Sequence, residues 1–161
     1  YPSWDGKWAD LATGYPSSDT FAKGTAFWLS TRGADTQITL NGEVPTLASD
    51  AKVITAGTFT MIGSSFSADM ALNSGYDWLA AGATAAGGSG TADNILVWDP
   101  TTSGYTTYFL YTSGGTYPSW DGKWADLATG YPTADTLAVG QGAWYMSRGA
   151  SDWTWTQAKP Y

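Results

Sequence analysis

The sequence contains no cysteine and no histidine. Their absence excludes disulfide bonds, catalytic groups built on an imidazole or a thiolate, haem ligation, and zinc sites made of these side chains. Carboxylate, hydroxyl and lysine chemistry remain. A glycosidase needs two carboxylates in one cleft, and the 14 acidic residues show no spacing that selects a pair. We therefore expect a protein that is not an enzyme and that uses no cofactor or metal.

Basic residues and long apolar runs are also scarce. Seven Lys and Arg stand against 14 Asp and Glu, which gives a formal net charge of -7, and the basic residues are scattered along the chain. This charge repels phosphate backbones, so nucleic acid is excluded as a partner. No run of 18 apolar residues is present, so we expect no membrane-spanning helix.

Aromatic and glycine residues are abundant. The 161 residues, about enough for one domain, include 10 Trp, 10 Tyr and 20 Gly. Runs rich in β-branched and aromatic residues predict strands. These runs are 52–55, 58–62, 95–98, 105–111, 143–147 and 153–156. Strands at this spacing predict an all-β fold, an antiparallel sandwich or barrel-like domain with under about a fifth of its residues in helices.

Turn signals separate the predicted strands. Asn41-Gly42, Asp5-Gly6 and Asp121-Gly122 are dipeptides that favour type I′ hairpin turns. Residues 99–104 contain Pro, Ser and Gly and predict the loop of a hairpin between strands 95–98 and 105–111. One short helix is expected at 75–82. A second is expected at 125–128 and at its repeat, 9–12.

The chain contains an internal repeat with an offset of 116 residues. The sequence YPSWDGKWADLATGYP at 1–16 recurs unchanged at 117–132. Similarity continues at the same offset, with Trp28 matching Trp144 and Arg32-Gly33-Ala34 matching Arg148-Gly149-Ala150, and then fades. Residues 1–36 are therefore predicted to be a partial copy, the back half of a domain, and residues 37–161 a complete β domain.

A half domain made of strands leaves unpaired edges and an uncovered apolar face. Upstream chain in a longer tandem array would cover it. Alternatively, a neighbouring molecule completes residues 1–36, so that subunits join head to tail. A third interpretation is that residues 1–36 fold back onto their own domain as extra strands. The second interpretation predicts a homopolymer.

Tryptophan and tyrosine side chains are the candidate interface residues. Trp153 and Trp155 lie two apart on a predicted strand and so share one face. Planar side chains of this kind anchor protein interfaces or stack on sugar rings, although many rings in a small β domain belong to its core. The predicted interface set is Tyr1, Trp4, Trp8, Trp28, Trp120, Trp124, Trp153 and Trp155.

Aspartates near one predicted strand raise the alternative of bound calcium. Asp93 and Asp99 flank residues 95–98, but their spacing lacks the Asp-x-Asx-x-Asx-Gly pattern of a calcium-binding loop. Turn and capping roles account for these residues without a metal. Arg32 and Arg148, each followed by Gly, are expected at strand ends where they hold carboxylates or carbonyls.

The order of aromatic and glycine motifs resembles a known type of domain. The motifs are ADNILVWD at 92–99, GYTTYFLY at 104–111, WDGKW at 120–124 and VGQGAW at 139–144. Together they resemble an uncharacterised β-rich domain, often repeated in tandem, of secreted and surface proteins of some bacteria. The resemblance covers residues 37–161, with 1–36 as a partial second copy. It implies an extracellular or cell-surface location and brings no catalytic residues.

These observations favour a structural subunit of an extracellular filament or surface array. The chain combines a half domain that needs a partner, many aromatic residues and only 13% charged residues. The alternative is a secreted carbohydrate-binding module with exposed Trp and Tyr platforms, whose partner would be a polysaccharide. A cell-wall or adhesin stalk domain that does not polymerise is a third interpretation.

Overall fold

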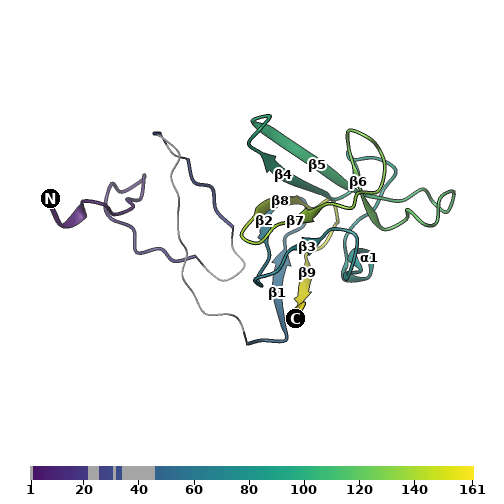
Figure 1. Cartoon of the computed structure of the whole chain (residues 1–161), viewed down its shortest axis with the longest axis horizontal. Coiled ribbons are helices and arrows are strands. Elements are labelled where there is room, and N and C mark those ends of the chain that lie inside the picture. The colour runs from purple at the N-terminus through teal and green to yellow at the C-terminus, as the bar shows by residue number, and fades with distance from the viewer. Residues whose placement is uncertain (1, 22–25, 31, 34–45) are drawn as a thin grey trace.

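The computed structural model describes residues 2–21, 26–30, 32–33 and 46–161. Regular structure in this part of the chain is almost entirely strand, which confirms the all-β prediction (Figure 1). The two short helices are η1 (Pro2–Trp4) and α1 (Trp78–Ala81). The strands are β1 (Ser49–Ile54), β2 (Phe59–Gly63), β3 (Met70–Ala71), β4 (Asn94–Asp99), β5 (Gly104–Tyr111), β6 (Lys123–Asp126), β7 (Thr136–Leu137), β8 (Gly142–Met146) and β9 (Trp153–Ala158).

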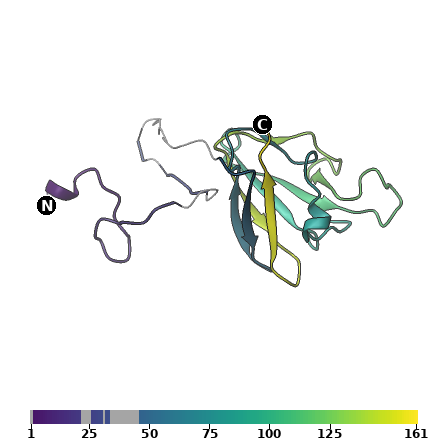
Figure 2. The ribbon, with the colours of Figure 1, turned by 90° about the horizontal axis from the view of Figure 1, so that it is seen from below.

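All strand pairs are antiparallel. The largest sheet has the order β2-β8-β4-β5-β6, and two-stranded sheets are formed by β1 with β9 and by β3 with β7. The predicted β4–β5 hairpin is confirmed, with Asp99 opposite Gly104 at its end. The sheets do not close into a barrel. Figure 2 shows β1 and β9 as a separate layer beside the larger sheet.

Alternation along β9 explains how the small sheet contributes to the core. Trp153 and Trp155 are buried, whereas Thr154 and Thr156 are exposed. On the paired strand, Ile54 lies opposite Trp153 and is buried too. Side chains at every second position of a strand point to the same face, so Ile54, Trp153 and Trp155 share the face of β1–β9 that packs on the core.

The core lies between the β1–β9 sheet and the five-stranded sheet and is organised around Trp78. The indole of Trp78 stacks on Trp155 at 5.8 Å and on Tyr145 at 6.1 Å between ring centroids. Its Nε1 donates a hydrogen bond of 2.9 Å to the carbonyl of Leu72, so the polar atom of this buried ring is satisfied. Helix α1, which carries Trp78, begins at an Asp77 N-cap.

The outer side of the five-stranded sheet has a buried cluster at one of its two ends. Residues 83–92 cross the β5–β6 end, where Ala92, Phe109 and Ala125 form a second buried cluster. Ala86 ties this segment to β5, since its N–H donates to Leu110 and its carbonyl accepts from Thr112, each at 3.1 Å. The opposite end, formed by β2, β8 and β4, keeps large apolar side chains partly exposed.

Two local predictions are wrong in both copies of the repeat, at Asp5-Gly6 and residues 9–12 as well as at Asp121-Gly122 and residues 125–128. Asp121-Gly122 makes a turn leading into β6 rather than a type I′ hairpin, because Gly122 has φ 75° while Asp121 does not have a positive φ. Residues 125–128 are not helical: Ala125 belongs to β6, and Asp126 ends the strand by accepting a bond from the Ala128 N–H. The predicted Asn41-Gly42 hairpin lies outside the described residues.

Within the described residues, no helix has the length and apolar character needed to cross a membrane.

Candidate functional site

Residues 2–21 (the N-terminal copy) and residues 118–137 (the C-terminal copy) share their turns and backbone hydrogen bonds as far as Ser17 and Thr133. Gly6 and Gly122 have φ 74° and 75°, and each copy contains one isolated bridge, Ala9–Pro16 or Ala125–Pro132. Three backbone hydrogen bonds also match. The Asp10 N–H donates to Tyr15 O as the Asp126 N–H does to Tyr131 O, both at 2.9 Å, and the Gly14 N–H donates to Asp10 O (2.8 Å) as the Gly130 N–H does to Asp126 O (2.7 Å). The Ser17 N–H donates to Trp8 O (2.8 Å) as the Thr133 N–H does to Trp124 O (3.0 Å).

Aromatic pairs match between the copies as well. Trp4 meets Tyr15 edge to face at 5.3 Å and 72°, and Trp120 meets Tyr131 at 5.4 Å and 73°. These contacts form within each copy and do not depend on the surrounding domain. The shared sequence is therefore sufficient to specify this local structure in two different environments.

The C-terminal copy is held inside its own domain. Trp124 is 0% exposed and packs edge to face on Trp78 at 5.2 Å and on Tyr145 at 5.9 Å. Leu137, at the other end of the copy, is also 0% exposed. Its strand β7 pairs with β3, where Met70 lies opposite Leu137.

Asn73 fixes the backbone of the C-terminal copy. Its Nδ2 donates to the carbonyls of Trp124 and Thr133, each at 2.8 Å, and its Oδ1 accepts from the Trp124 N–H at 2.6 Å. One side chain thus satisfies three backbone groups, two in strand β6 and one at Thr133. Because these bonds reach the main chain, they do not depend on which side chains the copy carries.

A tyrosine–carboxylate contact completes this arrangement. The Tyr108 hydroxyl donates to Asp135 at 2.7 Å, and Thr133 Oγ1 donates to the same carboxylate at 2.6 Å. Burial, followed by the bond to Asp135, raises the pKa of Tyr108 above its usual range. We call the residues that hold the C-terminal copy the receiving site: Met70, Asn73, Trp78, Tyr108 and Tyr145.

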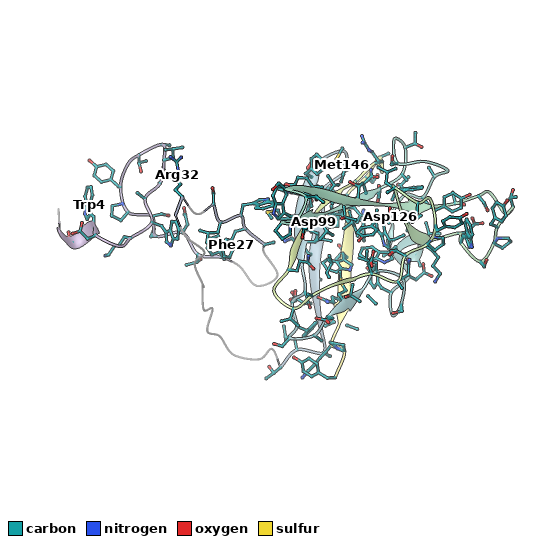
Figure 3. The ribbon with its side chains drawn as sticks, turned by 45° about the horizontal axis from the view of Figure 1, so that its top comes forward. Trp4, Phe27, Arg32, Asp99, Asp126 and Met146 are labelled. Atoms are coloured by element: carbon teal, nitrogen blue, oxygen red, sulfur yellow. The ribbon has the colours of Figure 1, made fainter. Side chains whose placement is uncertain are left out.

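The N-terminal copy lies away from the sheets (Figure 1), and Figure 3 shows Trp4 at the opposite end of the molecule from Asp126. Trp8, the counterpart of Trp124, is 75% exposed, and Phe21, the counterpart of Leu137, is 67% exposed. Among the described residues, Asp19 accepts a side-chain hydrogen bond from Ser17 at 2.7 Å, without the tyrosine that its counterpart Asp135 has. The copy therefore presents to solvent the side chains that its twin buries.

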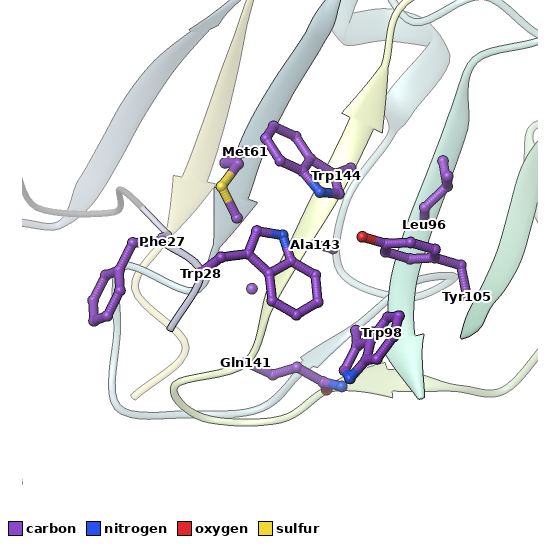
Figure 4. Close-up of a pocket in the computed structure, with 10 residues that line it drawn as sticks. Phe27, Trp28, Met61, Leu96, Trp98, Tyr105, Gln141, Ala143 and Trp144 are labelled. Carbon is purple, nitrogen blue, oxygen red and sulfur yellow. The ribbon is translucent and has the colours of Figure 1, made fainter. Parts of the chain in front are cut away.

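A second surface lies on the β2–β8–β4 end of the five-stranded sheet. We call it the outer aromatic face, and it consists of Phe59, Met61, Leu96, Trp98, Tyr105 and Trp144. A cleft of about 200 Å³ opens on this face (Figure 4). Phe27 and Trp28 also line this cleft, and Gln141 lies at one side.

Residues 26–28 lie against the outer aromatic face. Trp28 meets Trp98 edge to face at 5.2 Å and Tyr105 at 6.2 Å. Ala26 approaches the sheet so closely that a Cβ added to Gly142 would lie 2.6 Å from its own Cβ. The contact joins the two repeats, because Trp28 is the repeat counterpart of Trp144 on the same face (Figure 4).

The predicted interface residues fall into four groups. Trp4, Trp8 and Trp28 are exposed, Trp120 is partly buried, and Tyr1 lies outside the described residues. The inclusion of Trp124, Trp153 and Trp155 is corrected, because all three are buried in the core. The spacing of Trp153 and Trp155 placed them on one face correctly, but that face packs on Trp78 and Tyr145 instead of meeting solvent.

Asp93 has a structural role in the interior. Its buried carboxylate accepts hydrogen bonds from the Tyr145 hydroxyl at 2.6 Å and from the N–H groups of Thr84 and Arg148. Arg148 thus meets a carboxylate through its backbone, whereas its guanidinium was expected to do so. Burial and the neighbouring Asp93 raise the pKa of Tyr145 above its ordinary value.

Acidic residues do not gather into a metal site among the described residues. Asp93 precedes β4 and Asp99 ends it, so the two carboxylates lie at opposite ends of a six-residue strand. Asp99 instead caps its own turn, accepting from the Thr101 N–H and the Thr102 hydroxyl at 2.8 Å each, and these bonds lower its pKa. The capping role proposed from sequence explains this residue.

No family model matches the chain, and comparisons with curated proteins and with solved structures find no significant match.

Proposed function

We propose that the protein is a structural subunit of an extracellular filament or surface array, in which residues 1–36 are a partial repeat completed by a neighbouring chain. One observation carries this proposal: Trp8 is 75% exposed in a sequence whose identical copy buries the corresponding Trp124 completely. A conformation that is already formed but uncovered is suited to binding, because little ordering is left to oppose association.

Exposed apolar surface on the first 30 residues supports assembly. Soluble monomers rarely expose contiguous apolar patches beyond a few hundred Å². Burying Trp8 and Phe21 would remove on the order of 300 Å² from water, worth roughly 7 kcal/mol before costs. Association itself costs about 4–15 kcal/mol, so a lasting assembly needs further contacts. The exposed large apolar residues of this segment are Trp4, Trp8, Leu11, Tyr15, Phe21, Phe27 and Trp28.

Completion by the same chain has less support. Among the described residues, the segments 2–21, 26–30 and 32–33 contribute no strand to any sheet. Folding back as extra strands would require such pairing, so a second chain is the better source of cover.

An extracellular setting follows from the resemblance to tandem domains of secreted bacterial surface proteins. With no cysteine in the chain, durability outside the cell would depend on burial and backbone pairing across subunits. The outer aromatic face would contribute to this burial, since it already packs against an aromatic ring, that of Trp28 in the same chain.

Negative-stain electron microscopy tests the proposal. The purified full chain should form filaments or ordered arrays. A chain of residues 37–161 should fold, because the core residues all lie between Ile54 and Trp155. It should form no filaments, because it lacks the N-terminal copy. A matched pair of full-length variants separates surface chemistry from length. Trp8→Ala with Phe21→Ala should lose assembly. Ser18→Ala with Thr20→Ala, at two exposed positions, should keep it. Assemblies formed equally by the full chain and by residues 37–161 would refute the proposal.

A polysaccharide remains the second candidate partner, now for a different surface. Trp153 and Trp155 are buried and cannot provide the platform, but Trp98, Tyr105 and Trp144 line a cleft together with Trp28 of the same chain. Sugar rings stack on the faces of such side chains. Titration with soluble polysaccharides, read by tryptophan fluorescence in the full chain and in Trp98→Ala, tests this function. A change in the full chain that Trp98→Ala abolishes would support it.

A further inference from the structure

The Trp–Tyr pairs of the two copies have the same geometry and present their tyrosines to solvent to the same extent. Trp4 and Tyr15 lie 5.3 Å apart between ring centroids at an interplanar angle of 72°, and Trp120 and Tyr131 lie 5.4 Å apart at 73°. Tyr15 and Tyr131 are each 62% exposed. We propose that these pairs are two equivalent binding sites for the sugar rings of a neutral polysaccharide. They are separate from the outer aromatic face, and the inference does not depend on assembly into filaments.

Burial does not account for the identity of the two copies. Of the sixteen residues 117–132, which repeat residues 1–16 unchanged, two are buried, Trp124 and Ala125. Core residues outside this stretch differ between the copies, since the counterpart of Leu137 is Phe21 and that of Tyr145 is Leu29. A requirement of the fold would preserve core residues first. The unchanged sequence therefore points to a role for its exposed side chains.

The pair stays accessible when its copy is packed into a domain. In the C-terminal copy Trp124 is buried in the core, yet Tyr131 keeps 62% of its surface exposed. Trp120 also stacks on Tyr117 at 5.2 Å, and Tyr117 is exposed as well. A neighbouring chain that covered Trp8 as the domain covers Trp124 would leave the N-terminal pair open in the same way.

The chemistry around each pair fits a neutral sugar. Flat aromatic rings offer a surface on which the C–H faces of sugar rings stack. The same turn carries groups that can bond to sugar hydroxyls, a carboxylate at Asp10 or Asp126 and a hydroxyl at Thr13 or Thr129. The net charge of -7 repels anionic polymers, so the sugars are expected to be uncharged.

The presence of two identical pairs favours a polymer with a repeating unit. Figure 3 shows Trp4 and Asp126, which belong to different copies, at opposite ends of the molecule. Each pair can therefore hold a sugar unit of the same strand or of a different strand, and two linked sites bind more tightly than one. A globular protein with a single epitope would have no use for the second pair.

Isothermal titration calorimetry with cellohexaose, chitohexaose, mannohexaose and xylohexaose tests the inference on the full chain. At least one of these neutral hexasaccharides should bind the unmodified chain at two sites. Tyr15→Ala and Tyr131→Ala should each leave one site, and the double variant should leave none. The matched control is Leu11→Ala with Leu127→Ala, which removes exposed apolar side chains from the same two copies and should keep both sites.

Absence of binding by every hexasaccharide, a single site in the unmodified chain, or two sites that persist in the double tyrosine variant would overturn the inference. Loss of binding in the leucine control would overturn it too, because the surface would then bind through general apolar character. If Tyr131→Ala does not fold by circular dichroism, Tyr131→Leu replaces it under the same criteria, since leucine is apolar but has no flat ring. The double tyrosine variant keeps Trp8 and Phe21, so filaments formed without sugar binding would overturn this inference and leave the proposed function standing.

Discussion

Trp8 and Trp124 occupy the same position in two identical sixteen-residue sequences, yet Trp8 is 75% exposed and Trp124 is 0% exposed. The turns around them match in φ, in hydrogen bonding and in the packing of the preceding tryptophan on a tyrosine. The difference therefore arises from the surroundings: one copy meets Asn73, Trp78 and Tyr145, and the other meets solvent.

The same substitution should have opposite consequences in the two copies. Trp124→Ala removes a buried indole from the core and should lower the free energy of unfolding by about 3–5 kcal/mol. Trp8→Ala removes an exposed one and should change it by less than about 0.5 kcal/mol. Urea unfolding of both variants, at a concentration where the protein is monomeric, measures the difference. Equal losses would show that Trp8 is buried within its own chain.

Asn73 should be more important for stability than its partial burial indicates. Asn73→Ala leaves the Trp124 N–H and the carbonyls of Trp124 and Thr133 without this partner. We expect a loss of about 2–4 kcal/mol in thermal or urea unfolding, since each net hydrogen bond contributes about 1 kcal/mol and buried unsatisfied groups cost more. Ser74→Ala is the neighbouring control. A loss below about 1 kcal/mol would mean that the C-terminal copy is held by packing alone.

Tyr145 should make the domain sensitive to alkali. Burial and Asp93 raise its pKa in the folded state above the ordinary value of 10.0. In the unfolded chain it loses its proton near pH 10, while the folded chain keeps it, so the unfolded state binds fewer protons and stability falls as pH rises above 10. Unfolding measured between pH 8 and 11 should show a shallower fall in Tyr145→Phe, which is also less stable at pH 8 because Asp93 loses a donor.

Tyr117→Phe, at an exposed tyrosine, is the control for this pH profile. It should leave both the stability at pH 8 and the slope above pH 10 close to those of the unmodified chain. A slope that Tyr145→Phe does not change would show that the buried Tyr145–Asp93 contact is not the source of the alkaline sensitivity.

Gly142→Ala should release residues 26–28 from the outer aromatic face without damaging the domain. An added Cβ would lie 2.6 Å from the Ala26 Cβ but 3.7 Å from the nearest backbone atom of the sheet, Ile62 O. Gly63→Ala is the matched control, since its Cβ would lie 3.9 Å from Ala26. Proton NMR cross-peaks between the Trp28 and Trp98 indoles should disappear in Gly142→Ala and persist in Gly63→Ala. Their persistence in both would contradict the contact.

The strand runs were predictable because local chemistry and tertiary pairing agree there. The β4–β5 hairpin, for example, joins two runs of β-branched and aromatic residues through a Pro- and Gly-containing loop. β6 was missed because Trp124-Ala125-Asp126 has no strand signal of its own and becomes a strand by pairing with β5. The very short strands β3 and β7 were missed for the same reason.

The candidate site was predictable only in part. The repeat identified Trp8 and Trp124 as a pair, but their sequences are identical, so no local signal could show which one is buried. Asn73 was missed because a single asparagine in a loop has no motif, and its role depends on a backbone 51 residues further along the chain. The outer aromatic face was missed because its residues come from four strands that the sheet brings together.

Sedimentation velocity of the full chain and of residues 37–161, across a wide range of protein concentration, tests the central claim most directly. The full chain should show species larger than a monomer whose proportion rises with concentration, because its N-terminal copy is covered by other chains. Residues 37–161 should sediment as a folded monomer throughout. A full chain that remains monomeric at every concentration, or a truncated chain that associates equally well, would contradict the account.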